Sequence, residues 1–220
     1  MDSYTLAFEV VSQAGSIACM DATGTIVDQR RIGHRRFAQD LVPLLDACIR
    51  EHGRPGALAV AAGPGSFTGL RVSVIAARSI AWIDDLPVHA VDSLTARAVQ
   101  AGPGCWWVLM GLKRDTTFHA CIRVDMQLRS EVLMPVQAQG DAAAPDLRSL
   151  PPEAVAIGPA LDQKPDLLTT WAPDRSSGST AGLDASGVAL AARHSAARHW
   201  STVLPAYHQV SAPELQRKGA

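Results

Sequence analysis

Short apolar runs separated by turn residues open the chain and predict three strands. The runs cover residues 5–11, 16–20 and 25–31. Ser12-Gln13-Ala14-Gly15 and Asp21-Ala22-Thr23-Gly24 separate them, and short turns of this composition usually join antiparallel neighbours. We therefore expect an antiparallel meander at the start of a sheet.

The spacing of apolar residues then changes from strand-like to helical. Between Phe37 and Glu51 the apolar positions recur every three or four residues, which predicts an amphipathic helix. The remaining pattern of the first half predicts alternating elements: a strand over 57–62, a helix over 70–84, a strand over 87–91 and a helix over 93–100.

Ala101-Gly102-Pro103-Gly104 reads as a linker to a second, thinner half. That half predicts strands over 106–111, 117–124 and 131–135, a loose stretch over 137–153, a short strand over 155–158 and an Ala-rich helix over 185–199. Three antiparallel strands followed by alternating helices and strands describe the ribonuclease-H-like sheet of actin-like proteins. We expect an α/β fold with two lobes, residues 1–102 and 103–220, and the last residues are candidates for packing back on the first lobe.

Composition and charge narrow the function classes. The formal net charge of -1 argues against a broadly basic surface for binding RNA. A local basic cluster is either an RNA contact or a solvated turn; it consists of Arg30, Arg31, His34, Arg35 and Arg36. The cysteines stand singly, without a C-x-x-C pair, so neither a zinc site nor a redox motif is predicted. No apolar run is long enough to span a membrane and no leader is visible, so we expect a cytoplasmic protein without a bound metal.

A glycine-rich loop stands before the second predicted helix and is a candidate phosphate site. Helix N-termini attract anions, but glycine turns before helices are common, and the Lys-Ser/Thr pair of a Walker A motif is missing. Both readings stay open. The candidate phosphate residues are Gly63, Gly65, Ser66, Thr68 and Gly69.

The helix after this loop has more apolar surface than one contact needs. At about 100° per residue, Leu70 and Val74 begin one apolar stripe and Val72 and Ala76 begin another. One stripe can face the sheet and the other a neighbouring helix. The remaining face mixes apolar residues with arginine, as an interface core does, or it is covered by the same chain. Its members are Arg71, Ile75, Arg78 and Trp82.

Residues Gly63–Arg71, with the sequence Gly-Pro-Gly-Ser-Phe-Thr-Gly-Leu-Arg, closely resemble the signature of the bacterial TsaB (YeaZ) family. Supporting resemblances lie in residues 6–9, 41–46, 91–94 and 204–207, whereas residues 137–187 align poorly.

The resemblance implies an actin-like fold of the ASKHA type and a role in forming threonylcarbamoyladenosine on tRNAs that read codons beginning with A. It implies an accessory subunit without chemistry of its own, which binds a TsaD-like transferase and a TsaE-like ATPase, reaches tRNA only through the complex, and forms a homodimer when alone. The subunit itself requires no cofactor; whether ATP or ADP sits at the junction with the partner stays open. The expected partner interface comprises Phe37, Leu41, Leu44, Arg71, Ile75, Arg78 and Trp82.

The chain departs from the family pattern at three places around a would-be catalytic cleft. Glu9-Val10-Val11 stands where the family has Asp-Thr-Ser, Phe37-Ala38-Gln39 where it has His-Ser-Glu, and Gly111-Leu112-Lys113 where it has Asp-Ala-Arg. Each change removes polar or acidic groups, which favours the non-catalytic interpretation.

Two enzymatic alternatives have specific sequence requirements. An independent actin-like ATPase or kinase needs an acidic residue for Mg²⁺ beside a phosphate loop, and Glu9 and Asp92 are the candidates. A metallopeptidase needs paired histidines at helical spacing, whereas His194 and His199 are five residues apart and predict different faces of one helix.

Overall fold

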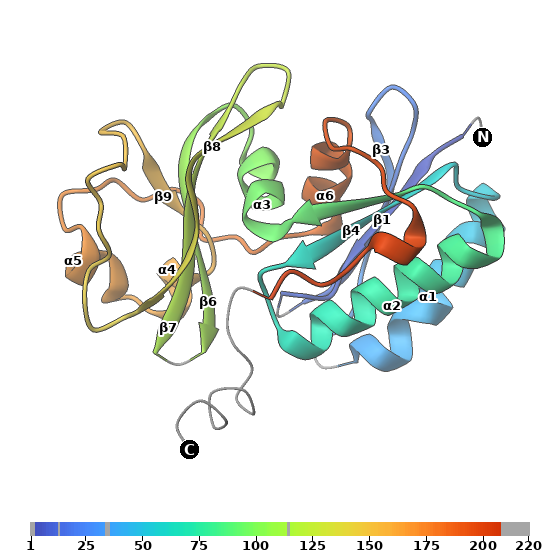
Figure 1. Cartoon of the computed structure of the whole chain (residues 1–220), viewed down its shortest axis with the longest axis horizontal. Helices are drawn as coiled ribbons and strands as arrows, with labels where there is room; N and C mark the ends of the chain where they lie inside the picture. The colour runs from blue at the N-terminus through green and yellow to red at the C-terminus, as the bar shows by residue number, and fades with distance from the viewer. Residues whose placement is uncertain (1–2, 13, 34–35, 114, 208–220) are drawn as a thin grey trace.

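The computed structural model describes residues 3–12, 14–33, 36–113 and 115–207, and two sheets organise them (Figure 1). The first sheet has the strand order β3-β2-β1-β4-β5. β1 pairs antiparallel with β2 and parallel with β4, β2 pairs antiparallel with β3, and β4 pairs parallel with β5. This order confirms the predicted meander and the ribonuclease-H-like, actin-like fold. The strands are β1 (Thr5–Glu9), β2 (Ser16–Met20), β3 (Ile26–Arg31), β4 (Ala57–Gly63) and β5 (Val88–Asp92).

The second sheet has the order β8-β7-β6-β9. β6, β7 and β8 are antiparallel neighbours, and β9 runs parallel to β6. The prediction of a loose stretch from residue 137 was wrong at its start, because β8 continues to Gly140 by pairing with β7. The strands are β6 (Gly104–Lys113), β7 (Thr116–Val124), β8 (Ser130–Gly140) and β9 (Val155–Ile157).

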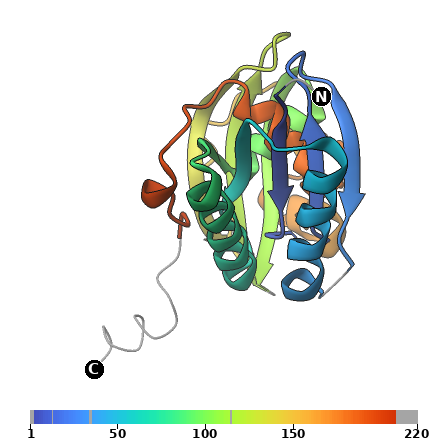
Figure 2. The same ribbon diagram turned by 90° about the vertical axis from the view of Figure 1, so that its right-hand side faces the viewer.

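Helices cover both faces of the first sheet. α1 (Phe37–His52) and α2 (Phe67–Asp84) lie side by side on one face, as Figure 2 shows. α3 (Ser93–Ala101) and α6 (Ala185–Ala192) lie between the two sheets, whereas the short α4 (Ala160–Gln163) and α5 (Leu167–Trp171) belong to the second lobe. The Ala-rich helix was predicted to reach His199 but ends at Ala192, so His194 and His199 lie outside it.

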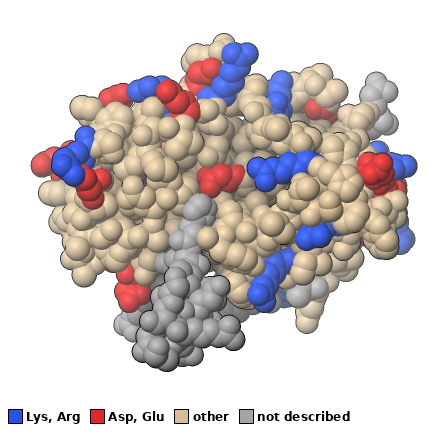
Figure 3. Space-filling model, in the orientation of Figure 1, with Lys and Arg blue, Asp and Glu red and all other residues tan. Residues whose placement is uncertain are grey.

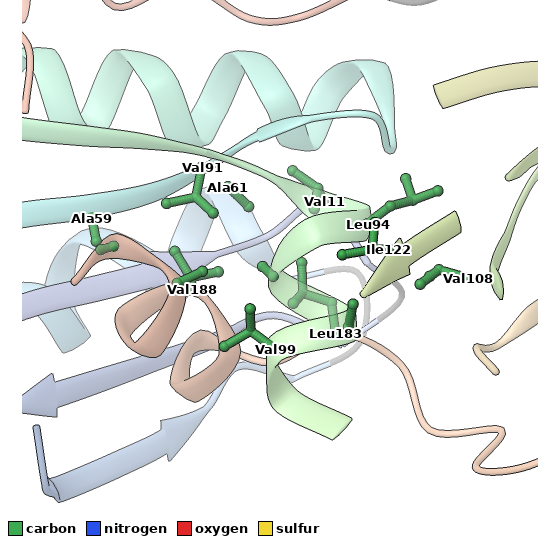
Figure 4. Close-up of a cluster of buried hydrophobic side chains, with 14 of the residues drawn as sticks. Val11, Ala59, Ala61, Val91, Leu94, Val99, Val108, Ile122, Leu183 and Val188 are labelled. Atoms are coloured by element: carbon green, nitrogen blue, oxygen red, sulfur yellow. The ribbon is translucent and has the colours of Figure 1, made fainter. Parts of the chain in front are cut away.

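Alternation along the central strands explains this layering. In β1, Leu6 and Phe8 point into the core beneath α1 and α2, whereas Ala7 points into the core shared with α6. The core that contains Ala7 continues through α3 to the other sheet, which contributes Val108 and Ile122 to it (Figure 4). Alanines on the inner face of the sheet leave room for α6 to pack closely.

The end of the described chain returns to the first lobe. The backbone of Arg198 pairs with Val88 on the edge strand β5, and the amide of Ala206 donates to the carbonyl of Ala62 at 2.7 Å. A 3₁₀ turn, η1 (Trp200–Thr202), packs beside α2 between these two contacts. Within the described residues, no helix is long and apolar enough to cross a membrane.

Candidate functional site

The glycine-rich loop joins β4 to α2 and lies against the end of β1. A Cβ at Gly69 would overlap the carbonyl oxygen of Val10, and a Cβ at Gly65 would come within 2.7 Å of the Val11 side chain. These glycines therefore let the start of α2 approach the β1 backbone closely.

The polar groups of Ser66 in this loop are hydrogen-bonded within the protein. The amide of Ser66 donates to the Val11 carbonyl at 3.0 Å, and its hydroxyl caps α2 by accepting from the amide of Gly69 at 3.3 Å. Thr68 is exposed in the first turn. Close packing accounts for the glycines by itself, so phosphate binding by this loop stays a prediction.

A cleft of about 590 Å³ lies between the lobes and begins at this loop. Ser12, Gly65 and Ser66 line it from the first lobe, and Met110, Gly111 and Asp162 line it from the second. Gly111 and Phe37, two of the positions that depart from the family pattern, both stand in this lining.

Glu9 ends β1 next to the cleft-lining residues Ser12 and Ser16, to which it is hydrogen-bonded, and is itself fully buried. One carboxylate oxygen accepts from the amides of Val11 and Ser12, each at 3.1 Å. The other accepts from the hydroxyls of Ser12 at 2.8 Å and Ser16 at 3.3 Å. Burial raises the pKa of Glu9 to about 7, against the lowering effect of these hydrogen bonds.

The Glu9 network reaches the second helix layer. The hydroxyl of Ser16 also accepts from the amide of Ala185, the first residue of α6, at 2.8 Å. Glu9 thus joins the end of β1, the start of β2 and the start of α6. The other acidic candidate, Asp92, caps α3 by accepting from the amide of Thr95 at 2.8 Å.

The two histidines named as candidate metallopeptidase ligands have separate partners. His194 interacts with the carbonyl of Gln127 at 3.0 Å, and His199 with the hydroxyl of Ser201 at 2.7 Å. Each histidine thus interacts with a different residue, and neither lies on α6, so the paired arrangement on one helix that a metallopeptidase needs is not formed by these two residues.

α2 presents an exposed apolar stripe away from the sheet, and we call it the α2 stripe. It consists of Phe67, Ile75 and Trp82, which are 46%, 63% and 66% exposed, with Arg71 between them. The guanidinium of Arg71 lies 4.1 Å from the ring centre of Phe67, a cation–π contact. Arg78 is half-buried on the same side of the helix.

Aromatic residues of the returning chain extend this stripe. The ring of Tyr207 lies 5.3 Å from that of Phe67, and its hydroxyl accepts from Arg71 at 3.4 Å. At the other end of the stripe, the ring centres of Trp200 and Trp82 lie 6.5 Å apart. In Figure 3, Lys and Arg side chains stand singly among uncharged surface over the lobe that carries α2.

The contribution predicted for α1 needs correction. Leu41 is 1% exposed and belongs to the core, and Phe37 and Leu44 are partly buried against that core. The apolar spacing that revealed this helix is its core stripe, which the sheet already covers. Among the described side chains of α1, the large aliphatic one that is exposed is Val42, at 63%, which sequence reasoning missed because a single residue makes no periodic pattern.

The basic cluster is divided among local ion pairs. Arg30 pairs with Asp28 at 2.6 Å and with Glu51, and Arg36 pairs with Asp40 at 3.2 Å. Arg31 lines the cleft. His34 and Arg35 lie outside the described residues.

Parts of the chain match known protein sequences. The family model "TsaD: tRNA N6-adenosine threonylcarbamoyltransferase" matches residues 25–104. The tRNA threonylcarbamoyladenosine biosynthesis protein TsaB of Haemophilus influenzae is 33% identical over 100 residues, which are 44% of this chain and 42% of that protein. The TsaB of Escherichia coli is 30% identical over 105 residues, 46% of this chain and 43% of that protein. The matches thus span less than half the length of these relatives.

Comparisons of structure match nearly the whole chain. A Pseudomonas aeruginosa protein described as uncharacterized with similarity to peptidase YEAZ has a TM-score of 0.80 at 19% identity, covering 94% of this chain and all of that one. YeaZ from Pseudomonas aeruginosa has a TM-score of 0.77 at 20% identity, covering 93% of this chain and 99% of that one. At such identity the likeness concerns the fold. Together with the sequence matches to proteins named TsaB, it confirms the resemblance of this chain to the TsaB (YeaZ) family.

Proposed function

We propose that this chain is an accessory subunit that binds and supports a TsaD-like transferase in forming N6-threonylcarbamoyladenosine on tRNAs reading codons that begin with A. The observation that carries the proposal is the α2 stripe, an apolar and arginine-bearing helix face that the described chain leaves exposed. The sequence matches to TsaB proteins and to the TsaD family model support the choice of process and partner.

The chemistry of the stripe suits a protein partner. Large exposed apolar side chains in a row are unusual on a monomer, and tryptophan with arginine is the composition of interface hot spots. Phe67 and Arg71 already hold each other through the cation–π contact, and Tyr207 buttresses both. Preorganised side chains lose less conformational entropy when a partner binds.

The non-catalytic part of the proposal rests on the cleft. Glu9, the acidic residue at the end of β1, has both carboxylate oxygens engaged by the protein itself. The proposal extends to a TsaE-like ATPase as a further partner, to a homodimer in the absence of partners, to tRNA contact only within the complex and to a cytoplasmic location. A nucleotide, ATP or ADP, would sit at the junction with the partner subunit.

The test is binding to the TsaD-like protein of the same organism, measured by co-purification and by titration calorimetry. Ile75→Asp and Trp82→Ala should each weaken binding at least about tenfold, because each removes an apolar contact from the centre of the stripe. Val132→Asp is the matched control, since Val132 is 55% exposed on β8 of the other lobe. Wild-type binding by both stripe variants, or no binding by the unmodified chain, would refute the proposal.

A second measurement tests the non-catalytic part. The isolated chain should show no steady-state ATP hydrolysis above background. Turnover that Glu9→Gln abolishes would identify an independent enzyme instead.

A further inference from the structure

Four side chains of the type that bind soft metal ions meet between α1 and the outer strands of the first sheet. Cys19 on β2 stands directly opposite Asp28 on β3 in the strand register, so both face α1. Cys48 and His52 are four residues apart on α1, hence on one face of the helix. Three elements therefore converge on one point.

The ligand atoms are close enough to share one ion. The Cys19 sulfur, an Asp28 carboxylate oxygen and a His52 ring nitrogen all lie within 4.8 Å of one another. Cys48 lies outside this group of three, but its thiol interacts with that of Cys19 from one turn of α1 before His52, so a rotation of its side chain toward the ion would supply a fourth donor. Ligands of a tetrahedral zinc ion stand roughly 3.5 Å apart, so small side-chain rotations would close the shell.

We propose that Cys19, Asp28, Cys48 and His52 form a binding site for a thiophilic divalent cation of the zinc class. Two thiolates, an imidazole and a carboxylate belong to the donor set that such ions prefer, and four of them complete a tetrahedron. A closed shell of four protein ligands is typical of a structural ion. The site is independent of the proposed function.

The charges around the site fit a bound cation. Two thiolates and a carboxylate bring three negative charges, of which a divalent ion offsets two, and the guanidinium of Arg30, which Asp28 at 2.6 Å shares with Glu51, reduces the remaining charge. Arg30 also orients that carboxylate, as outer-shell partners of metal ligands do.

Burial gives the site both a protected interior and an entrance. Cys19 and Cys48 are fully buried, whereas the side chains of His52 and Asp28 are 16% and 19% exposed. An ion can therefore reach the thiols past the imidazole and carboxylate. The ring of Tyr4 stands edge-on to His52, with ring centres 6.0 Å apart, and limits its rotation.

The experiment loads the isolated full chain with metal after treatment with a chelator. Zn²⁺ should bind at one ion per chain by elemental analysis and raise the unfolding temperature, because a ligand of the native state stabilises it. Co²⁺ should give the near-ultraviolet charge-transfer band of thiolate coordination. Cys19→Ser and Cys48→Ser should each weaken that band, because each thiolate contributes to it, and the variant with both replacements should lack it.

The second cysteine pair supplies the matched control. Cys105 and Cys121 lie 3.9 Å apart, sulfur to sulfur, in the other sheet, and their replacement by serine should leave the band unchanged. His52→Gln is the variant least disturbing to the core and should weaken Zn²⁺ at least about tenfold. Absence of metal uptake, a band that is not weakened in Cys19→Ser and Cys48→Ser or that survives when both are replaced, or Zn²⁺ affinity unaltered in His52→Gln would overturn the proposal.

Discussion

Glu9 shows how one residue can satisfy a sequence pattern and still serve a different purpose. It stands at the end of the first strand, where an ATPase of this fold would place an acidic ligand, yet its carboxylate accepts hydrogen bonds from three neighbours, Val11, Ser12 and Ser16. Those partners hold the turn after β1 together. Because Ser16 also caps the start of α6, the charge of Glu9 affects the junction of three elements.

The first prediction concerns the pH dependence of stability. The pKa of Glu9 is raised from 4.5 to about 7 in the native state, so the native state keeps a proton that the unfolded state releases in this window. The free energy of unfolding should therefore fall as pH rises from 4.5 to 7, by on the order of 3 kcal/mol from this group. Glu9→Gln should lack that contribution, because its amide does not titrate.

Urea unfolding at pH 5 and pH 8 measures this effect. The glutamine variant should gain stability relative to the unmodified chain between the two pH values. A difference between the two proteins that is the same at both pH values would contradict the prediction.

At the scale of elements, the sequence predicts α2 better than α1. The inner stripe of α2, beginning with Leu70 and Val74, is buried as expected, and Ile75 and Trp82 are exposed. α1 has a single apolar stripe, and the same residues cannot both fill the core and meet a partner. The correction of Leu41 follows from that limit.

The proposed cation site of Cys19, Asp28, Cys48 and His52 could not be predicted from the sequence. Its members come from β2, β3 and α1, and no local spacing links Cys19 to Cys48 or to Asp28. Only Cys48 and His52 are linked by local spacing: they are four residues apart, but the helix predicted from the sequence ends at Glu51, one residue before His52, whereas the helix of the structure includes it. The strand register brings the other two ligands to them.

The contact between α2 and β1 gives the second prediction. Gly69→Ala should destabilise the protein by about 3 kcal/mol, although alanine favours helices, because its Cβ overlaps the Val10 carbonyl oxygen. Gly182→Ala is the control, since its Cβ meets nothing within 4 Å. Urea unfolding should show a change of under about 1 kcal/mol there. Equal stability of the two variants would mean that the backbone of α2 shifts without cost.

At the scale of the whole molecule, the chain passes between the lobes twice, and α3 fastens the two crossings together. The chain leaves the first lobe after α3 and returns through residues 179–184 to α6. Arg97 on α3 is buried, and its guanidinium donates to the carbonyls of Ala181 at 2.7 Å and Ser179 at 3.3 Å. One turn later, Gln100 accepts from the amide of Asp184 at 3.0 Å. The sequence predicted the linker near residue 102 but not the second crossing at residues 179–184. That crossing is held through backbone carbonyls, which every residue type has, so no sequence pattern reveals it.

Arg97 should therefore control how firmly the lobes are held. In Arg97→Leu the Ala181 carbonyl loses the guanidinium that binds it inside the protein, so we expect faster amide exchange over residues 177–184 and a loss of about 2 kcal/mol in unfolding free energy. Arg148→Leu is the matched control, since the side chain of Arg148 is 91% exposed and pairs only with Asp146 among the described residues. Hydrogen exchange read by mass spectrometry separates the two variants. If residues 177–184 exchanged at the same rate in both, the junction would have to be held by Gln100 and the α6 cap, and the role assigned to Arg97 would be wrong.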